Sequence, residues 1–224
     1  YFGWRAPIFG AGLLTLLAII LNIKFMPAKT AQQSNNGAER LMSGLEKLMR
    51  VFIAALTNKI FWTLVLLFVI CGATTNGIMW SHFTPAANDC DISITSASSA
   101  FMLIGIFNVV GTITAGWLSD RASVRAILSI VFAGRALTLL WLPSIFANVS
   151  EPQLFLFGAI FGLLDVATVP PVIVICNRVY GDRGHEIFGW INAFHQLGAG
   201  GMAFIGAVIR SSSGSYDLLW LLSG

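Results

Sequence analysis

The chain has 224 residues, of which 56% are hydrophobic and only 10% are charged, and its mean hydropathy is +0.80. Soluble domains usually carry about 25% charged residues, so a soluble fold is excluded and lipid must cover much of this surface. The net charge of +3 would suit a nucleic-acid partner. However, the basic residues lie in short segments between apolar runs, which is typical of membrane-protein loops, so we expect a lipid bilayer and no nucleic acid.

Six apolar stretches are long enough to cross a bilayer, because a spanning helix needs about 20 mostly apolar residues. A seventh stretch begins near Asp217, and the chain starts at Tyr1 rather than at Met, so we interpret it as a fragment. Polar segments rich in Ser, Asn, Asp, Gly and Pro predict loops at 84–95, 119–123, 148–152, 177–185 and 211–216. The predicted spans are residues 7–26, 60–82, 96–118, 124–147, 153–176 and 186–209.

The segment 27–58 differs from the other connections in its length and its pattern. Its part at 31–36 is polar, and we expect little order there. From Leu41 to Leu56 apolar residues recur at helical spacing, separated by Glu46, Lys47 and Arg50. This pattern predicts an amphipathic helix, which either lies at the membrane surface or acts as a connector without a lipid role.

The basic residues divide unevenly between the two sides of the membrane. One set of loops holds nearly all of them, whereas the opposite loops hold only Arg5 and Arg210. The positive-inside rule places the first set in the cytoplasm, and the six spans alternate consistently under this assignment. The cytoplasmic set is Lys29, Arg40, Lys47, Arg50, Lys59, Arg121, Arg125, Arg178 and Arg183.

The turn after the third predicted span reads Gly-Trp-Leu-Ser-Asp-Arg-Ala-Ser-Val-Arg, from Gly116 to Arg125. It resembles the cytoplasmic signature of major facilitator transporters, Gly-x-Leu-Ala/Ser-Asp-Arg-x-Gly-x-Arg/Lys, with Ser123 in place of the usual Gly. Physically, Asp120 can cap the next helix and face Arg121 or Arg125. A simple capped, positively charged loop is the alternative interpretation. The resemblance implies a conformational motif formed by Gly116, Asp120, Arg121 and Arg125.

The resemblance extends over essentially the whole chain. Gly3-Trp4-Arg5 is similar to the start of the family's sixth helix, and the stretches at 82–83, 162–171 and 188–201 resemble bacterial members related to monocarboxylate porters. This implies an all-α membrane protein of the bacterial inner membrane, with helices six to eleven and the start of twelve of a twelve-helix major facilitator fold. The missing N-terminal helices would be its partner. The implied parts are a sixth transmembrane helix at 1–26, a central cytoplasmic loop with an amphipathic helix at 27–58, and an incomplete C-terminal bundle at 59–224.

Arg135 and Asp165 fall within predicted spans, where a charge is costly and marks a functional candidate. Arg135 lies ten positions after Arg125, and Asp165 lies eleven before Cys176, which is about 15 and 17 Å from the same face at roughly 1.5 Å per residue. Because their helices are consecutive and antiparallel, we expect an ion pair near the midplane. The pair either serves substrate or proton coupling or only fixes helix packing. The resemblance favours Asp165 as the substrate or proton group, with Arg135 as its partner.

Asn192, His195 and Gln196 form a polar stripe on one predicted helix. His195 can titrate near neutral pH, which suits proton coupling, although such a residue more often hydrogen-bonds across a helix interface. Asn108 lies near mid-depth, with Thr112 one turn later. Animal monocarboxylate transporters carry, by the resemblance, an Asp and an Arg at these two positions, so their proton–lactate mechanism is not expected here. Asn108 can still offer neutral hydrogen bonds to a substrate.

Glycines and prolines in the predicted spans indicate close packing and bending. Gly158 and Gly162 form a Gly-x-x-x-Gly pair, which predicts close helix packing. Pro170-Pro171 removes two N–H donors and predicts a bend on the cytoplasmic side of Asp165. Helix packing is the default role for Thr74, Thr75 and Asn76.

The leading hypothesis is secondary active transport of a small solute, with an organic anion as a candidate substrate and a proton as a candidate coupling ion. In the family, two halves rock around a midplane site. An enzyme is disfavoured, because the sequence contains neither His-Glu-x-x-His nor Gly-x-Ser-x-Gly. Three widely spaced cysteines give no metal site, so we expect no catalytic residue, metal or cofactor. The alternatives are a non-transporting fragment and a polytopic receptor or channel.

Overall fold

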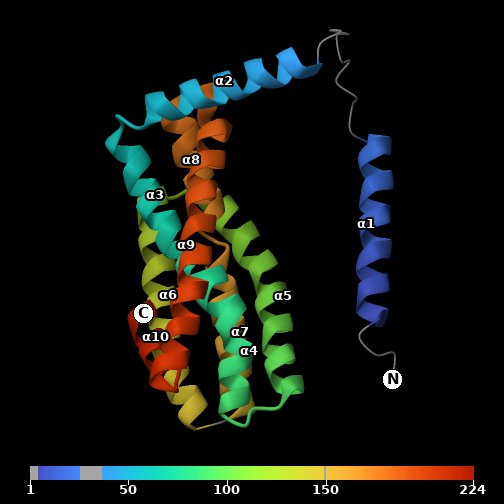
Figure 1. The fold of residues 1–224 in the computed structure, drawn as a ribbon, viewed down its shortest axis with the longest axis vertical. Coiled ribbons are helices and arrows are strands. Elements are labelled where there is room, and N and C mark those ends of the chain that lie inside the picture. The colour runs from blue at the N-terminus through green and yellow to red at the C-terminus, as the bar shows by residue number, and fades with distance from the viewer. Residues whose placement is uncertain (1–4, 26–36, 149) are drawn as a thin grey trace. The chain divides into compact units, whose positions relative to one another are not determined.

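The computed structural model describes residues 5–25, 37–148 and 150–224, and every regular element among them is helical (Figure 1). The chain divides into two compact units, residues 1–46 and 47–224. The polar segment 31–36, for which the sequence predicts little order, lies outside the described residues.

The first unit contains α1, Arg5–Phe25, which agrees with the predicted span at 7–26. Its described side chains are exposed and mostly apolar around the whole helix, including Leu13, Leu17 and Ile20. A helix that is apolar on all sides is typical of a membrane span or a deeply buried core helix.

The second unit is a bundle of long helices. Its first rod runs without a loop from Lys59 to Asp89, as α3 (Lys59–Gly72), the π-helical segment η1 (Ala73–Met79) and α4 (Trp80–Asp89). The next two helices are α5 (Ile94–Ser119) and α6 (Val124–Ala147). The rest of the bundle comprises α7 (Glu151–Asp165), α8 (Val169–Tyr180), the 3-10 turn η2 (Gly181–Arg183), α9 (Gly184–Ser213) and α10 (Asp217–Ser223).

Four stretches of the described chain are long and apolar enough to cross a membrane: 59–89, 94–119, 124–147 and 151–213. The last has 63 residues. As one straight helix it would be roughly 95 Å long, about three times the hydrocarbon thickness of a bilayer. The chain instead turns back at Gly181, which has a positive φ of 58°, and Gly184 at the start of α9 packs against Asn177 of α8. This stretch therefore holds the two crossings predicted at 153–176 and 186–209.

Three predicted loops are too long, because the helices that flank them continue further than their apolar residues. The loop predicted at 84–95 is reduced to 90–93, since α4 passes through Pro85 and ends at Asp89. Likewise α8 continues to Tyr180 and α9 to Ser213. Polar residues are compatible with a helix that continues past the hydrocarbon layer, so they do not by themselves indicate a loop.

The predicted amphipathic helix is present as α2, Gly37–Ala55. Val51 is buried against the bundle, and the Phe52 ring stacks on Trp190 of α9 with centroids 4.3 Å apart. Lys47 Nζ lies 3.1 Å from Glu186 Oε1 at the start of α9. This face of α2 is therefore a protein contact, while a role at the membrane surface remains a prediction for the other face. The exposed apolar residues of that face include Met49 and Ile53.

Two hydrophobic clusters fill the two ends of the bundle. One cluster includes Phe83, Phe157 and Trp220, and it lies at the end that the basic residues predict to be outside the cell, called the outer end below; the other includes Phe61 and Phe68, at the predicted cytoplasmic end. The polar residues described below belong to neither cluster. The bundle therefore has an apolar core at each end and a polar layer between them.

The Gly158–Gly162 pair is a close packing site, as predicted. A Cβ atom on Gly158 would lie 2.9 Å from the carbonyl oxygen of Ala100, and one on Gly162 would lie 2.6 Å from that of Ile104. Both distances are too short for a side chain. The two glycines therefore let α7 contact the backbone of α5 directly.

Candidate transport site

The polar layer contains an ion pair between two consecutive spans. Arg135 of α6 is 2% exposed, and Asp165, the last residue of α7, is 1% exposed. Arg135 Nη2 lies 3.7 Å from Asp165 Oδ1. The two charges thus meet as expected from their matched depth. Burying each charge costs several kcal/mol of desolvation, which a single contact of this length does not offset, so the surrounding hydrogen bonds matter.

Arg135 directs most of its donors to neutral groups. Its Nη2 donates to the backbone carbonyls of Asp165 and, at 3.4 Å, Leu164. Its Nη1 donates to Cys71 Sγ at 3.2 Å and to Thr74 Oγ1 at 3.3 Å. Its Nε has no hydrogen-bond partner among the described residues. One guanidinium group therefore joins α6 to the end of α7 and to the first rod.

Asp165 accepts hydrogen bonds from two further spans. Thr75 Oγ1 of η1 donates to Oδ1 at 2.8 Å, and Asn108 Nδ2 of α5 donates to Oδ2 at 3.3 Å. The carboxylate thereby connects the rod, α5, α6 and α7. Within the described part of the chain, Asn108 Oδ1 has no partner, so a hydrogen-bond acceptor remains open beside the carboxylate. Thr112, by contrast, uses its hydroxyl on the carbonyl of Asn108 in its own helix, at 2.7 Å.

The first rod changes its helical pitch beside this pair. Ala73–Met79 is π-helical, and both Thr74 and Thr75 belong to it. A π-helical turn holds more residues than an α-helical turn, so it rotates the following residues relative to an ordinary helix. Such turns are frequent at functional sites. Here the π-helical segment brings two adjacent threonines to the two members of the ion pair.

The second interruption lies between α7 and α8. The N–H of Val169 donates to the carbonyl of Val166 at 3.1 Å instead of to that of Asp165, as an uninterrupted α-helix would require. The next two residues, Pro170 and Pro171, have no N–H to continue the pattern. The carbonyl of Asp165 is thereby left for Arg135. The predicted bend on the cytoplasmic side of Asp165 is thus a complete break in the helix.

The residues of the predicted polar stripe on α9 do not all face the same surroundings. His195 is half-buried, and its ring lies 5.9 Å from the ring of Phe68 in α3. Asn192 and Gln196 are exposed on the bundle. His195 Nδ1 has no hydrogen-bond partner among the described residues. The structure thus assigns His195 to a helix interface, while Asn192 and Gln196 face away from the bundle.

The motif turn differs from the expectation in its capping. The prediction that Asp120 caps the next helix is wrong. Asp120 directly follows the end of α5 at Ser119, and the residue just before α6 is Ser123, whose side chain makes no capping hydrogen bond. Arg121 instead donates to the carbonyl of Trp117 at 3.2 Å and lies over its ring, 4.4 Å from the centroid.

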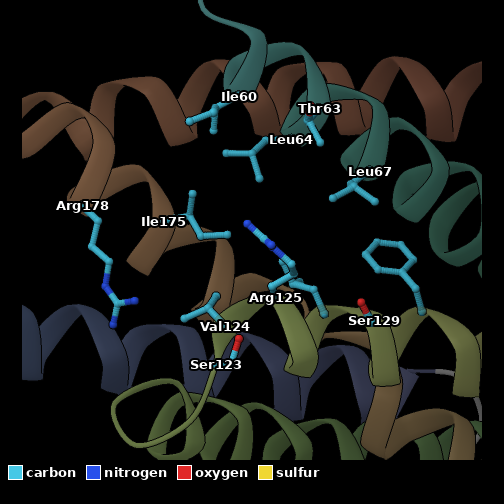
Figure 2. Close-up of a pocket in the computed structure, with 12 residues that line it drawn as sticks. Ile60, Thr63, Leu64, Leu67, Ser123, Val124, Arg125, Ser129, Ile175 and Arg178 are labelled. Carbon is cyan, nitrogen blue, oxygen red and sulfur yellow. The ribbon is translucent and has the colours of Figure 1, made fainter.

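Gly116 and Arg125, the two ends of the motif, both approach α8. A Cβ atom on Gly116 would lie 3.8 Å from Pro170 Cβ. Arg125 lines a groove of about 680 Å³ between α3, α6 and α8, and Figure 2 shows its side chain directed into that space. The residues of the ion pair do not line this groove, so the groove and the polar layer are separate features.

Sequence reasoning missed four residues of the polar layer. Helix packing was predicted for Thr74 and Thr75, and Cys71, which contacts Arg135, was considered only as one of three cysteines without a metal site. Thr168 lies in the break, with its Oγ1 3.5 Å from Cys71 Sγ. A signal was present, since residues 71, 74 and 75 fall on one helix face in an otherwise apolar span.

Comparison with known proteins identifies the family. The Major Facilitator Superfamily model matches residues 1–214. The uncharacterized MFS-type transporter YcxA of Bacillus subtilis is 30% identical over 154 residues, which cover 66% of this chain and 37% of that protein. Monocarboxylate transporter 12-B of Danio rerio is 25% identical over 148 residues, covering 64% and 30%, and human monocarboxylate transporter 12 is 24% identical over 151 residues, covering 65% and 29%.

The aligned part of the chain thus spans about a third of the length of these curated relatives. The match to the superfamily covers nearly the whole chain, including the motif turn and both interrupted spans. Together with the apolar helices, this makes the protein a multi-pass membrane protein of a transporter family. The chain belongs to the Major Facilitator Superfamily.

Proposed function

We propose that the full-length protein carries out secondary active transport of a small organic anion, coupled to a proton, by alternating access. The observation that supports this most is the buried Arg135–Asp165 pair, which lies where two spans are interrupted. Interrupted helices near the midplane are where secondary transporters place substrate and ion sites. The bacterial inner membrane is the location that fits such a symporter, with the N-terminal helices as the other half of the site.

The chemistry of the pair suits coupling of an anion to a proton. When Asp165 is ionised, Arg135 is balanced inside the protein. A proton on Asp165 would remove that balance and leave the guanidinium to attract the carboxylate of a substrate. The unpartnered Oδ1 of Asn108 could accept a hydrogen bond from a substrate hydroxyl or from the protonated acid. Proton and anion would then enter together without a net buried charge.

The names of the relatives favour the same substrate class. The chain is similar to proteins named as monocarboxylate transporters. Asn108 and Thr112 differ from the charged residues that those proteins are expected to have, so the charged pair between α6 and α7 would take their place. Asn192 and Gln196 would contribute to the wall shared with the N-terminal helices, while His195 would hold the interface between α9 and α3. The Gly116, Asp120, Arg121 and Arg125 motif would act in the change of conformation.

Uptake by the full-length protein tests the proposal. A panel of radiolabelled small organic acids would be offered to reconstituted vesicles at several external pH values, with and without a proton gradient. We expect gradient-dependent uptake of at least one acid, and its loss in Asp165→Asn. Asp89→Asn, which alters an exposed carboxylate at the outer end of the bundle, is the matched control and should retain uptake. Uptake that ignores the proton gradient would refute the coupling, and no uptake of any acid would refute the substrate class.

The exchanged pair Arg135→Asp with Asp165→Arg separates transport from packing. Both charges stay buried, so the protein level should recover relative to either single variant. If uptake also recovers fully, the pair serves only helix packing, and the proposal for its role fails.

A further inference from the structure

An aromatic platform lies on the outer side of the polar layer, where α4 and α5 run side by side (Figure 1). The indole ring of Trp80 stacks on the ring of Phe101, with centroids 5.2 Å apart and planes inclined by 27°. Phe83, which is fully buried in the cluster at the outer end, holds the Phe101 ring edge-on, with centroids 5.0 Å apart. Trp80 itself is 49% exposed. The rings therefore support one another, and one face of the indole is open.

The depth of Trp80 differs from that of the interfacial belt of aromatic residues. Trp80 follows Thr75 by five positions in the first rod, and Thr75 binds Asp165 in the polar layer. The indole therefore lies roughly 8 Å from the level of that carboxylate, whereas the belt lies about 15 Å from the midplane of a bilayer. At this depth an exposed tryptophan faces either lipid tails or a cavity within the protein.

The polar neighbours of the platform favour a cavity over lipid. Asn76 lies about one turn before Trp80 in the rod and is half-buried. On α5, residues 101, 105, 108 and 112 follow one another at spacings of three and four, so they form one helical stripe. That stripe joins Phe101 to Asn108, whose Oδ1 has no partner among the described residues. Polar side chains within a span usually face the bundle interior or a water-filled cavity.

Gly105 leaves open space between the platform and the polar layer. It lies one turn after Phe101 and one turn before Asn108, is exposed, and has no atom within 4 Å of the position of a Cβ atom. From Phe101 to Asn108 is roughly 10 Å of helix, of which a hydrogen bond to Asn108 takes about 3 Å. The remaining length fits a ring at the level of the platform, joined to a carboxylate by a short aliphatic linker.

We propose that Trp80, supported by Phe101, is a specificity-determining residue that selects acids with a planar aromatic ring on a short linker. This rests on the proposed function, in which Asn108 and Arg135 receive the carboxylate. The ring of the substrate would stack on the open face of the indole, and Gly105 would leave room for the linker. Aromatic stacking of this kind corresponds to a gain of about 2- to 10-fold in affinity beyond simple burial. A saturated ring is puckered and gains no such stacking.

Binding of a matched set of ligands to the full-length protein in detergent tests the platform. Phenylpropanoate, cyclohexylpropanoate and the uncharged phenylpropanamide would be compared by isothermal titration calorimetry at one mildly acidic pH. We expect phenylpropanoate to bind about 2- to 10-fold more tightly than cyclohexylpropanoate, although the saturated ring is the more apolar one and burial alone would favour it. The amide should bind weakly, because it offers no charge to Arg135. Equal affinity for the two acids, equal affinity for the acid and its amide, or no binding of phenylpropanoate overturns the proposal.

Substitutions locate the preference on the platform. Trp80→Ala should raise the Kd of phenylpropanoate about tenfold and abolish the preference for the planar ring, whereas Trp80→Phe should retain most of both. Gly105→Leu should block phenylpropanoate without lowering the melting temperature, because the space at its Cβ position is open. Gly189→Leu, at an equally open position near the cytoplasmic end of α9, is the matched control and should bind like the wild type. A ring preference that survives Trp80→Ala, or wild-type binding by Gly105→Leu, would show that the indole faces lipid and that the proposal is wrong.

Calorimetry measures binding without transport, so the two proposals fail separately. Proton-coupled uptake of aliphatic acids, with no preference for the planar ring, would refute the platform and leave the transport proposal standing. The expected ring preference, together with uptake that ignores the proton gradient, would support the platform and refute the coupling.

Discussion

The bundle contains two Arg–Asp pairs in contrasting surroundings. At the outer end, Arg210 of α9 binds Asp89 through Nη2 at 2.7 Å and Nε at 2.8 Å, with the side chains 35% and 37% exposed. In the polar layer, Arg135 and Asp165 are almost fully buried, yet their closest charged atoms are 3.7 Å apart. The pair with the better geometry is the one that water surrounds.

This contrast shows that the distance between two charges is a poor guide to how much their ion pair contributes to stability. Water screens the outer charges in both the paired and the separated state, so their pairing contributes little. The buried charges have lost their water, and neutral groups of the first rod, α5 and the end of α7 replace it. Removing a partner should therefore have very different consequences at the two sites.

The largest effect is expected from removing one member of the buried pair. Asp165→Ala would leave Arg135 buried and unpaired, which we expect to lower the free energy of unfolding by about 3–5 kcal/mol. Chemical unfolding in detergent micelles, followed by tryptophan fluorescence, measures this. Replacing both residues by apolar ones, Arg135→Met with Asp165→Leu, should restore much of the stability while abolishing uptake. A single variant as stable as the wild type would contradict the burial argument.

A smaller effect is expected at Thr75. Thr75→Val keeps the shape of the side chain but removes the hydrogen bond to the Asp165 carboxylate, and bonds to charged groups contribute about 1.5–3 kcal/mol. Thr75→Ser should retain the bond and most of the stability. Thr114→Val is the matched control, because that hydroxyl bonds only to carbonyls of its own helix. Equal free energies of unfolding for Thr75→Val and Thr114→Val would show that the hydrogen bond from Thr75 to Asp165 does not stabilise the protein.

The outer pair should be weakly coupled. A double-mutant cycle with Arg210→Ala and Asp89→Ala should give a coupling energy of about 0.2–1 kcal/mol, which decreases as salt is added. The same cycle at Arg135 and Asp165 should give a larger value that salt hardly changes. Similar coupling at the two sites, or similar salt dependence, would show that burial is not what distinguishes them.

The smallest effect concerns Cys90, which follows α4 at the outer end. Partial burial raises the pKa of its thiol, and the nearby carboxylates of Asp217, Asp89 and Asp91 raise this pKa further. The thiolate is the reactive form, so alkylation by an impermeant maleimide should be slow near neutral pH and accelerate as the pH rises. Asp217→Asn should accelerate it a few-fold.

Two variants of this labelling sharpen the comparison. Arg210→Ala would leave Asp89 without its counter-charge, so Cys90 should react more slowly than in the wild type. Cys176→Ser should change nothing, because that thiol is buried at the opposite end. Labelling that occurs only from the cytoplasmic side would invert the orientation given by the basic loops.

Much of this architecture could be predicted from the sequence. Hydropathy placed the spans because lipid imposes a length and an apolar surface on every crossing, whatever the tertiary contacts. The contact between Arg135 and Asp165 could be predicted from their depths alone. Their helices are consecutive and antiparallel, so both depths are counted from the same membrane face and can be compared directly. The tight contact at Gly158 and Gly162 followed from the same local reasoning.

The remainder depended on departures from the regular helix. Thr75 could not be placed on Asp165 from a spacing of 3.6 residues, because the π-helical segment changes the register within its own span. The cap expected at Asp120 failed because helix ends are set by where hydrogen bonding stops, and the sequence gives that point only within a few residues. The loops predicted around Asp89 and Ser213 were too long for the same reason.

The break between α7 and α8 also bears on how the protein is made. Arg135 leaves the ribosome thirty residues before the backbone carbonyl that it needs, that of Asp165. An arginine at the centre of a lone helix costs about 2.5–3.5 kcal/mol on insertion. The insertion of α6 into the lipid is therefore less costly if it is delayed until α7 has also reached the translocon. We expect the two to pass into the lipid as one hairpin, with the arginine already satisfied.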